Sequence, residues 1–269
     1  MPLTEHHQFV GRAVSLFRAD SRFVGAGVGG SWLTNTMDRF SDVDLVIVVE
    51  PESFCEVISE RTAIATKLGS CLAAFTGEHV GEPRLLICLY DSPLLHVDLK
   101  FVTLPDLTHR VEDPVVLWER EGRMSQVIAA SMAHYPPLDP QWIEDRFWVW
   151  AHYVALKIGR GELFEAISML DYLRQTAIAP FLHTRHGQSP RGVRHLERVA
   201  PEAVPYLVQS LATHTPLSCA DALLCVIKLY RDLREPLVGD DTITKRTDAE
   251  TAVMLYVHEI RTASENNNL

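Results

Sequence analysis

The sequence contains little cysteine, and its cysteines follow no metal-binding or redox motif. They stand at Cys55, Cys71, Cys88, Cys219 and Cys225, and no two of them form a Cys-x-x-Cys pair. The odd count argues against a complete set of disulfides, and the missing pair argues against a zinc or thioredoxin-type site. We therefore expect reduced, buried thiols with a structural role in a cytoplasmic protein.

Positive charge is also scarce. The 269 residues include 25 Lys and Arg against 35 Asp and Glu, which gives a net charge of −10 at pH 7. A stable complex with nucleic acid needs a basic surface, so we expect no such complex. The acidic balance is compatible with a small, cationic substrate, although many soluble proteins that bind nothing positive share it.

Long apolar runs are absent as well. No window holds the ~18 uncharged apolar residues that a membrane span requires. The N-terminal region carries Glu5, His6 and His7 where a signal peptide would need apolar residues. We therefore expect no membrane association and no secretion.

Apolar residues make up 47% of the chain, which is enough for a substantial core in one large domain or two ordinary ones. The clearest boundary is the proline-rich segment 136–140, where Asp139 can cap a helix and Pro140 suits its first turn. We therefore predict two domains, 1–135 and 136–269.

Hydrophobic periodicity predicts the elements of both domains. In the first we expect helices over 4–19 and 52–67, a helix start at 31–35, strands over 23–28, 43–49, 84–90 and 94–102, and an irregular stretch at 104–135. In the second we expect helices over 142–158, 162–183, 202–212, 218–233 and 248–263. Strands and helices thus mix in the first domain, and the second is an all-α bundle.

Two aspartates open the strand predicted over 43–49. Side chains alternate along a strand, so Asp42 and Asp44 project to one side while Val43 and Leu45 point toward a core. Neighbouring carboxylates repel one another, and a divalent cation between them would offset this cost. The simpler interpretation is that the pair only solvates the end of a loop.

A small-residue turn and a third aspartate favour a site over simple solvation. The turn at Gly29-Gly30-Ser31 lets a backbone approach phosphates closely, and a helix start after it would offer N–H groups to them. Asp98 lies in the middle of the strand predicted over 94–102, between apolar neighbours. If that strand adjoins 43–49, three carboxylates can converge, and such oxygen ligands suit Mg²⁺.

The spacing of these residues resembles the nucleotidyltransferase superfamily of DNA polymerase β type. The signature consists of Gly30-Ser31, a gap of ten residues, Asp42-Val43-Asp44 and the later strand residue Asp98. The size and the helical second half are similar to those of antibiotic nucleotidyltransferases that act on aminoglycosides and lincosamides. The stretch 32–40 departs from the family, because many relatives carry a small residue, Arg and Gly soon after the serine.

The resemblance implies an α+β fold in which one domain carries out catalysis and the other binds the acceptor. Residues 1–135 would form a catalytic domain with a mixed sheet and flanking helices, and 136–269 would form the helical domain that binds the acceptor. Two Mg²⁺ ions would be held by Asp42, Asp44 and Asp98.

The resemblance also implies that ATP or another NTP contacts Gly30 and Ser31 through its triphosphate, and that Ser41 occupies a position where the family often has serine. Lys100 shares the strand face of Asp98 and is either a nucleotide contact or a charge partner at the end of the strand. His96 lies on the same face, and we expect a structural histidine there because Mg²⁺ prefers oxygen.

Together these features predict the transfer of AMP from ATP to a hydroxyl of a small molecule, with release of pyrophosphate. By the resemblance, that small molecule could be an antibiotic. Asp98 is the expected base. Glu144 and Asp145 are alternatives to it, unless they only complement the dipole of their helix. Further contacts to the triphosphate could come from Lys157, Arg160, Lys228 and Arg231.

Two other functions stay open. The acceptor could be a side chain of another protein, or the chain could be a non-catalytic nucleotide-binding or antitoxin-like partner. A homodimer is also left open by the sequence.

Overall fold

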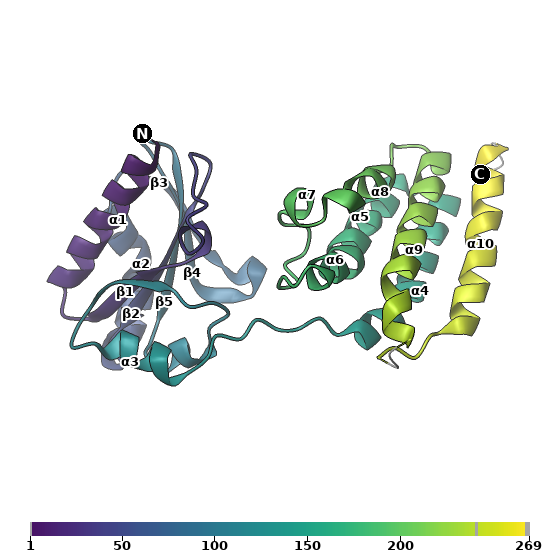
Figure 1. Cartoon of the computed structure of the whole chain (residues 1–269). Coiled ribbons are helices and arrows are strands. Elements are labelled where there is room, and N and C mark those ends of the chain that lie inside the picture. The colour runs from purple at the N-terminus through teal and green to yellow at the C-terminus, as the bar shows by residue number, and fades with distance from the viewer. Residues whose placement is uncertain (1, 240–241, 267–269) are drawn as a thin grey trace. The chain divides into compact units, whose positions relative to one another are not determined.

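The computed structural model describes residues 2–239 and 242–266. The chain divides into two compact units, Met1–Tyr135 and Pro136–Leu269 (Figure 1). Across the described ranges, no helix combines the length and the apolar character that a bilayer crossing demands.

The described part of the first unit contains one sheet of six strands in the order β3-β4-β5-β2-β1-β6. The strands are β1 (Phe23–Val28), β2 (Val43–Val49), β3 (Cys71–Gly77), β4 (Glu82–Tyr90), β5 (Leu95–Val102) and β6 (Val115–Glu119). The central pair β2 and β5 is parallel and the other neighbours are antiparallel. The sheet is therefore mixed, as expected for the fold class.

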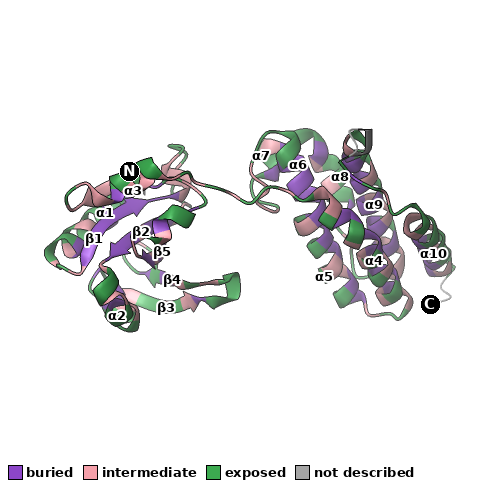
Figure 2. Cartoon of the chain, turned by 90° about the horizontal axis from the view of Figure 1, so that it is seen from below, coloured by how far each residue is buried: buried purple, intermediate pink, exposed green. Residues whose placement is uncertain are grey.

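The main core of this unit lies between one face of the sheet and the helices α1 (Pro2–Ala19) and α2 (Phe54–Thr66). Leu45 of β2 and Leu99 of β5 are buried there, together with every second residue on either side of them. Figure 2 shows buried residues along β1 and β2. The alternation of apolar side chains along the strands accounts for this face.

The opposite face carries a smaller core. Val48 of β2 and Val102 of β5 pack there against Met124 of α3 (Arg123–Ala130). Even-numbered residues of β2 and β5 therefore point away from α1 and α2. At the other end of the same strands, this face carries Asp44 and Asp98.

The prediction of an irregular stretch over 104–135 was wrong. This stretch contains the short helical turn η4 (Asp106–His109), the strand β6 and the helix α3. The apolar run within β6 becomes a strand because it pairs with β1, in the register Val28↔Val115. The strand β3 was also missed, since it lies at an edge of the sheet and its small residues show no clear alternation.

The second unit is helical throughout its described elements. They are α4 (Pro140–Gly159), α5 (Leu163–Leu173), α6 (Ala179–Arg185), α7 (Leu196–Val199), α8 (Val204–Gln209), α9 (Pro216–Gly239) and α10 (Thr247–Glu265), with the short turn η6 (Pro201–Ala203) before α8. As predicted, Asp139 caps α4 by accepting a hydrogen bond from Trp142 N. The helix predicted over 162–183 runs without a gap from Leu163 to Arg185, and its middle is a π-helical segment, η5 (Arg174–Ile178), between α5 and α6.

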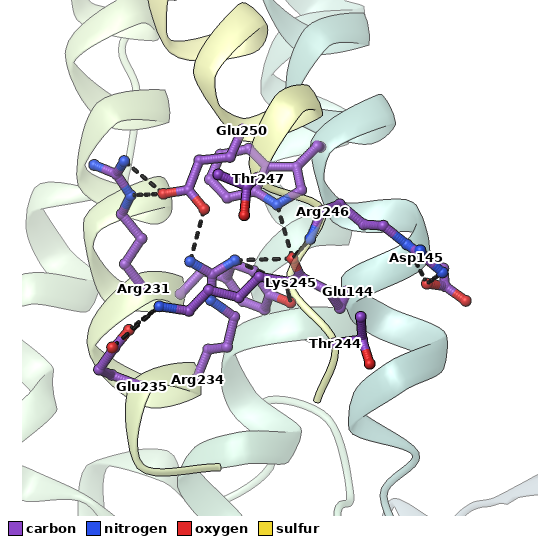
Figure 3. Close-up of polar contacts among 12 residues, drawn as sticks. Glu144, Asp145, Arg231, Arg234, Glu235, Thr244, Lys245, Arg246, Thr247 and Glu250 are labelled. Atoms are coloured by element: carbon purple, nitrogen blue, oxygen red, sulfur yellow. Dashed lines mark hydrogen bonds and ion pairs between the residues drawn. The ribbon is translucent and has the colours of Figure 1, made fainter. Parts of the chain in front are cut away.

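A buried polar cluster connects α4, α9 and α10 (Figure 3). Glu144 accepts hydrogen bonds from Tyr230 Oη at 2.6 Å, from Arg234 Nη1 at 2.9 Å to both oxygens, and from Arg246 N at 2.8 Å. Arg234 donates through Nη2 to Glu250 at 2.8 Å. Burial alone would raise the pKa of Glu144, but these donors outweigh it and hold the pKa below its ordinary value.

The cysteines fit the prediction only in part. All five lie in the described ranges as free thiols. Cys88 and Cys219 are buried, whereas Cys71 and Cys225 are half-buried and Cys55 is exposed. The expectation of buried thiols holds for Cys88 and Cys219 and in part for Cys71 and Cys225, which pack against the two cores, and it was wrong for the exposed Cys55.

Candidate functional site

The strands that carry the predicted carboxylates adjoin one another. In the parallel pair β2 and β5, Asp44 and Asp98 are direct partners in register. Neighbouring strands lie about 4.8 Å apart, so the two side chains emerge close together on the face opposite α1 and α2. Both residues are half-buried.

Asp42 lies outside the strand itself. It is the residue before Val43, where β2 begins, and it is half-buried. Among the described side chains, no set of three or more His, Cys, Asp and Glu residues is arranged to hold a metal ion as it stands. The topology thus brings Asp44 and Asp98 together and places Asp42 two residues away along the chain.

The turn after β1 lies directly against Asp44. Gly29 N donates to Asp44 O at 2.9 Å. Gly30 has a φ of +60°, and a Cβ added to it would lie 2.0 Å from Asp44 Oδ2. Glycine is therefore required at position 30 both by the backbone conformation and by the carboxylate beside it. Ser31 follows in a single turn of 3-10 helix, Gly30–Trp32, rather than in the predicted helix start at 31–35.

A further carboxylate meets this turn. Gly30 N donates a hydrogen bond to Glu112 Oε1 at 2.9 Å. Sequence reasoning missed Glu112, because it lies in the stretch predicted to be irregular. Only the pairing of Val115 with Val28 brings Glu112 beside Gly30.

Ser41 stabilises the loop that leads into β2. Its Oγ accepts a hydrogen bond from Asp38 N at 2.9 Å, and its carbonyl oxygen lies 2.9 Å from His6 Nε2. These contacts fix the backbone just before Asp42.

Lys100 forms an ion pair on the same face of the sheet as Asp98. Its Nζ lies 2.8 Å from Glu82 Oε2, and its side chain is 38% exposed. Glu82 also contacts Arg84 at 2.7 Å. The hydrogen bond from Arg84, opposed by burial and aided by Lys100, lowers the pKa of Glu82 to about 2. This geometry corresponds to the charge-partner interpretation of Lys100.

His96 contacts the third aspartate directly. Its Nε2 lies 3.0 Å from Asp98 Oδ1, and its side chain is 53% exposed. His96 therefore has a hydrogen-bond partner but lies at the surface, and its role as a structural histidine stays a prediction. Its location follows from the two-residue spacing along β5, which places both side chains on one face.

The candidates in the helical unit have partners within that unit. Glu144 is fully buried in the cluster of Figure 3, so it is not accessible to an acceptor hydroxyl. Asp145 pairs with Arg246 at 2.6 Å. The four predicted cations form the ion pairs Lys157–Glu162, Arg160–Glu162, Lys228–Asp232 and Arg231–Glu250.

No family model matches the chain, and no curated protein matches it. Among solved structures, it is similar to an aminoglycoside 6-adenyltransferase from Bacillus subtilis, with a TM-score of 0.43 and 16% identity over 92% of this chain and 96% of that one. It is also similar to a nucleotidyltransferase-like protein from Exiguobacterium sibiricum, with a TM-score of 0.39 and 14% identity over 85% of this chain and 74% of that one. Both TM-scores lie below 0.5, so neither likeness assigns an activity to the chain.

Proposed function

We propose that this chain is a magnesium-dependent nucleotidyltransferase that transfers AMP from ATP to a hydroxyl of a small molecule. The observation that carries the proposal is the pairing of Asp44 with Asp98 on adjoining parallel strands, beside a turn in which Gly30 has a positive φ and a Cβ would collide with Asp44. This arrangement combines carboxylates for a divalent cation with backbone N–H groups for phosphate.

The residues present fit Mg²⁺. Asp44 and Asp98 offer carboxylate oxygens side by side, and Asp42 offers another two residues earlier. Carboxylates held this close repel one another unless a cation lies between them. When bound there, Mg²⁺ would offset the charge of the triphosphate and favour ionisation of the attacking hydroxyl.

The roles of the chain's own residues follow from their positions. Gly30 and Ser31 bind phosphate oxygens through the turn after β1, and Asp98 accepts the proton of the acceptor hydroxyl. The hydroxyl oxygen attacks the α-phosphorus in line, a new P–O bond forms, and the bond to pyrophosphate breaks. The site contributes mainly by positioning these groups and by stabilising charge. The helical unit selects the acceptor.

The proposal is tested with ATP labelled at its α-phosphate and a panel of hydroxylated small molecules that includes aminoglycosides and lincosamides. We expect a labelled small-molecule product and an equal amount of pyrophosphate. A labelled protein band after incubation with cell lysate would instead identify a protein acceptor. If calorimetry detects no binding of Mg·ATP, the chain is not a nucleotidyltransferase.

A further inference from the structure

The turn assigned to phosphate already holds an anionic oxygen. Gly30 N donates to Glu112 Oε1, and a Cβ on Gly29 would lie only 2.9 Å from the same oxygen. A carboxylate oxygen on a backbone N–H makes the same kind of charge-assisted hydrogen bond that a phosphate oxygen would make. Glu112 and a phosphate therefore compete for one donor.

Electrostatics makes this competition stronger. Asp44 Oδ2 lies against the other side of Gly30, since an added Cβ there would meet it at 2.0 Å. A phosphate entering beside Gly30 would thus be an anion next to the two carboxylates of Asp44 and Glu112. Like charges at such short range disfavour one another, so the incoming anion favours the departure of Glu112.

The backbone beside Glu112 is held by the side chain of Arg110. Arg110 is buried and donates to Leu107 O at 3.0 Å, to Ile128 O at 2.9 Å and to Ser131 O at 2.7 Å. These bonds fix the backbone beside Glu112. Glu112 itself is half-buried, so a rotation of its side chain about fixed backbone is the movement that entry of a phosphate at Gly30 would require.

We propose that Glu112 takes the position of a phosphate oxygen at Gly30 N and must rotate away before nucleotide binds there. This inference rests on the proposed function and makes Glu112 a positioning residue that controls entry of the triphosphate. The competing explanation is that Glu112 only caps the Gly29–Ser31 turn and stabilises the fold. The two explanations predict opposite effects on nucleotide affinity.

The experiment compares wild type with Glu112→Gln and Glu112→Ala by calorimetric titration with Mg·ATP and with tripolyphosphate. We expect both variants to bind each ligand about tenfold more tightly, because one charge-assisted hydrogen bond no longer has to be broken. The nucleotide KM should fall in the same proportion while kcat stays within about twofold, since Glu112 has left before chemistry begins. The amide resonance of Gly30 should shift in Glu112→Ala in the way that it shifts when wild type binds ligand.

Asp113→Asn is the matched control. Asp113 is the next residue, carries the same charge and pairs with Arg110 at 2.5 Å rather than with Gly30. This variant weakens one ion pair of Arg110 but leaves its bonds to Leu107 O, Ile128 O and Ser131 O, so the affinity for Mg·ATP should stay within about twofold of wild type. If wild type binds Mg·ATP but the Glu112 variants bind no more tightly than Asp113→Asn, Glu112 is a cap and the inference is wrong while the proposed function stands. If no variant binds either ligand, the proposed function fails, and the inference fails with it.

Discussion

Two groups of acidic side chains, one in each unit of this chain, have different surroundings. In the helical unit, Glu144 is fully buried and meets the guanidinium of Arg234 through both oxygens. In the sheet unit, Asp44 lies opposite Asp98, and Glu112 contacts the same turn as Asp44. A buried carboxylate matched by a guanidinium fixes how helices pack, whereas neighbouring carboxylates favour a divalent cation. What faces an acidic residue, rather than how buried it is, thus separates the group that stabilises the helical unit from the group that we propose to be functional.

The largest expected effect comes from removing charge on the sheet side. In the double variant Asp42→Asn, Asp44→Asn, nucleotidyl transfer should fall by at least about a thousandfold, because the oxygens that would hold Mg²⁺ lose their charge. The melting temperature should stay the same or rise, since repulsion between carboxylates is relieved. Pyrophosphate release and thermal denaturation measure the two effects.

Glu52→Gln is the control for this double variant, because Glu52 is an exposed glutamate of the same unit. It should leave transfer unchanged. A large loss of stability in the double variant, with part of the activity retained, would contradict the metal role. The aspartates of the sheet unit would then stabilise the fold, as Glu144 does in the helical unit.

The reverse effect is expected in the helical unit. Glu144→Gln should reduce the free energy of unfolding by about 3 kcal/mol, because the buried guanidinium of Arg234 loses one of its two charged partners and keeps only Glu250. Urea denaturation followed by helical circular dichroism measures this change. Asp145→Asn removes the same charge one residue away, from an ion pair near the surface, and should cost far less. Equal midpoints for Glu144→Gln and wild type would show that the cluster does not stabilise the unit.

Much of the sheet could be predicted from the sequence, because its central strands carry their own signal. β1 and β2 have the predicted bounds, since apolar residues, most of them β-branched or small, run through both and are interrupted only by Asp44. β6 and α3 could not be predicted in the same way. They form because β6 pairs with β1, whose residues lie about ninety positions earlier in the chain. That pairing is a tertiary contact, and local periodicity does not record it.

The same distinction applies to the site. Asp44 and Asp98 could be placed on one face because alternation along a strand is a local rule. Glu112 reaches Gly30 across 82 positions, and Glu144 reaches Arg234 across 90. Neither partner can be read from spacing, so the carboxylate that blocks the turn and the carboxylate that holds the bundle both emerge only from the fold.

A smaller effect is expected when the glycine turn beside Asp44 is changed. Gly30→Ala should reduce stability by about 2–3 kcal/mol and raise the nucleotide KM, because the new Cβ would collide with Asp44 Oδ2 in addition to straining a positive φ. Gly81→Ala is the matched control. Gly81 also has a positive φ, +76°, but nothing lies within 4 Å of an added Cβ, so only the strain of about 1 kcal/mol remains. Thermal denaturation and steady-state kinetics compare the two, and equal losses would mean that Asp44 does not restrict the turn.

The smallest expected effect concerns Glu82, a carboxylate of the sheet unit that forms ion pairs with cations. It tests whether such ion pairs stabilise the sheet unit as the pair of Glu144 with Arg234 stabilises the helical unit. Arg84 and Lys100 lower the pKa of Glu82 from its ordinary value of 4.5 to about 2. Because the folded pKa is the lower one, this group contributes its full stability above pH 4.5 and loses it as the pH falls toward 2. Glu82→Gln should therefore flatten the decline in unfolding free energy over that window, whereas Glu52→Gln should not. Urea denaturation at several pH values between 2 and 6 measures the slope. If Glu82→Gln and wild type decline in parallel, the ion pair between Glu82 and Lys100 contributes nothing in solution, and Lys100 would then be available for the phosphate contact instead.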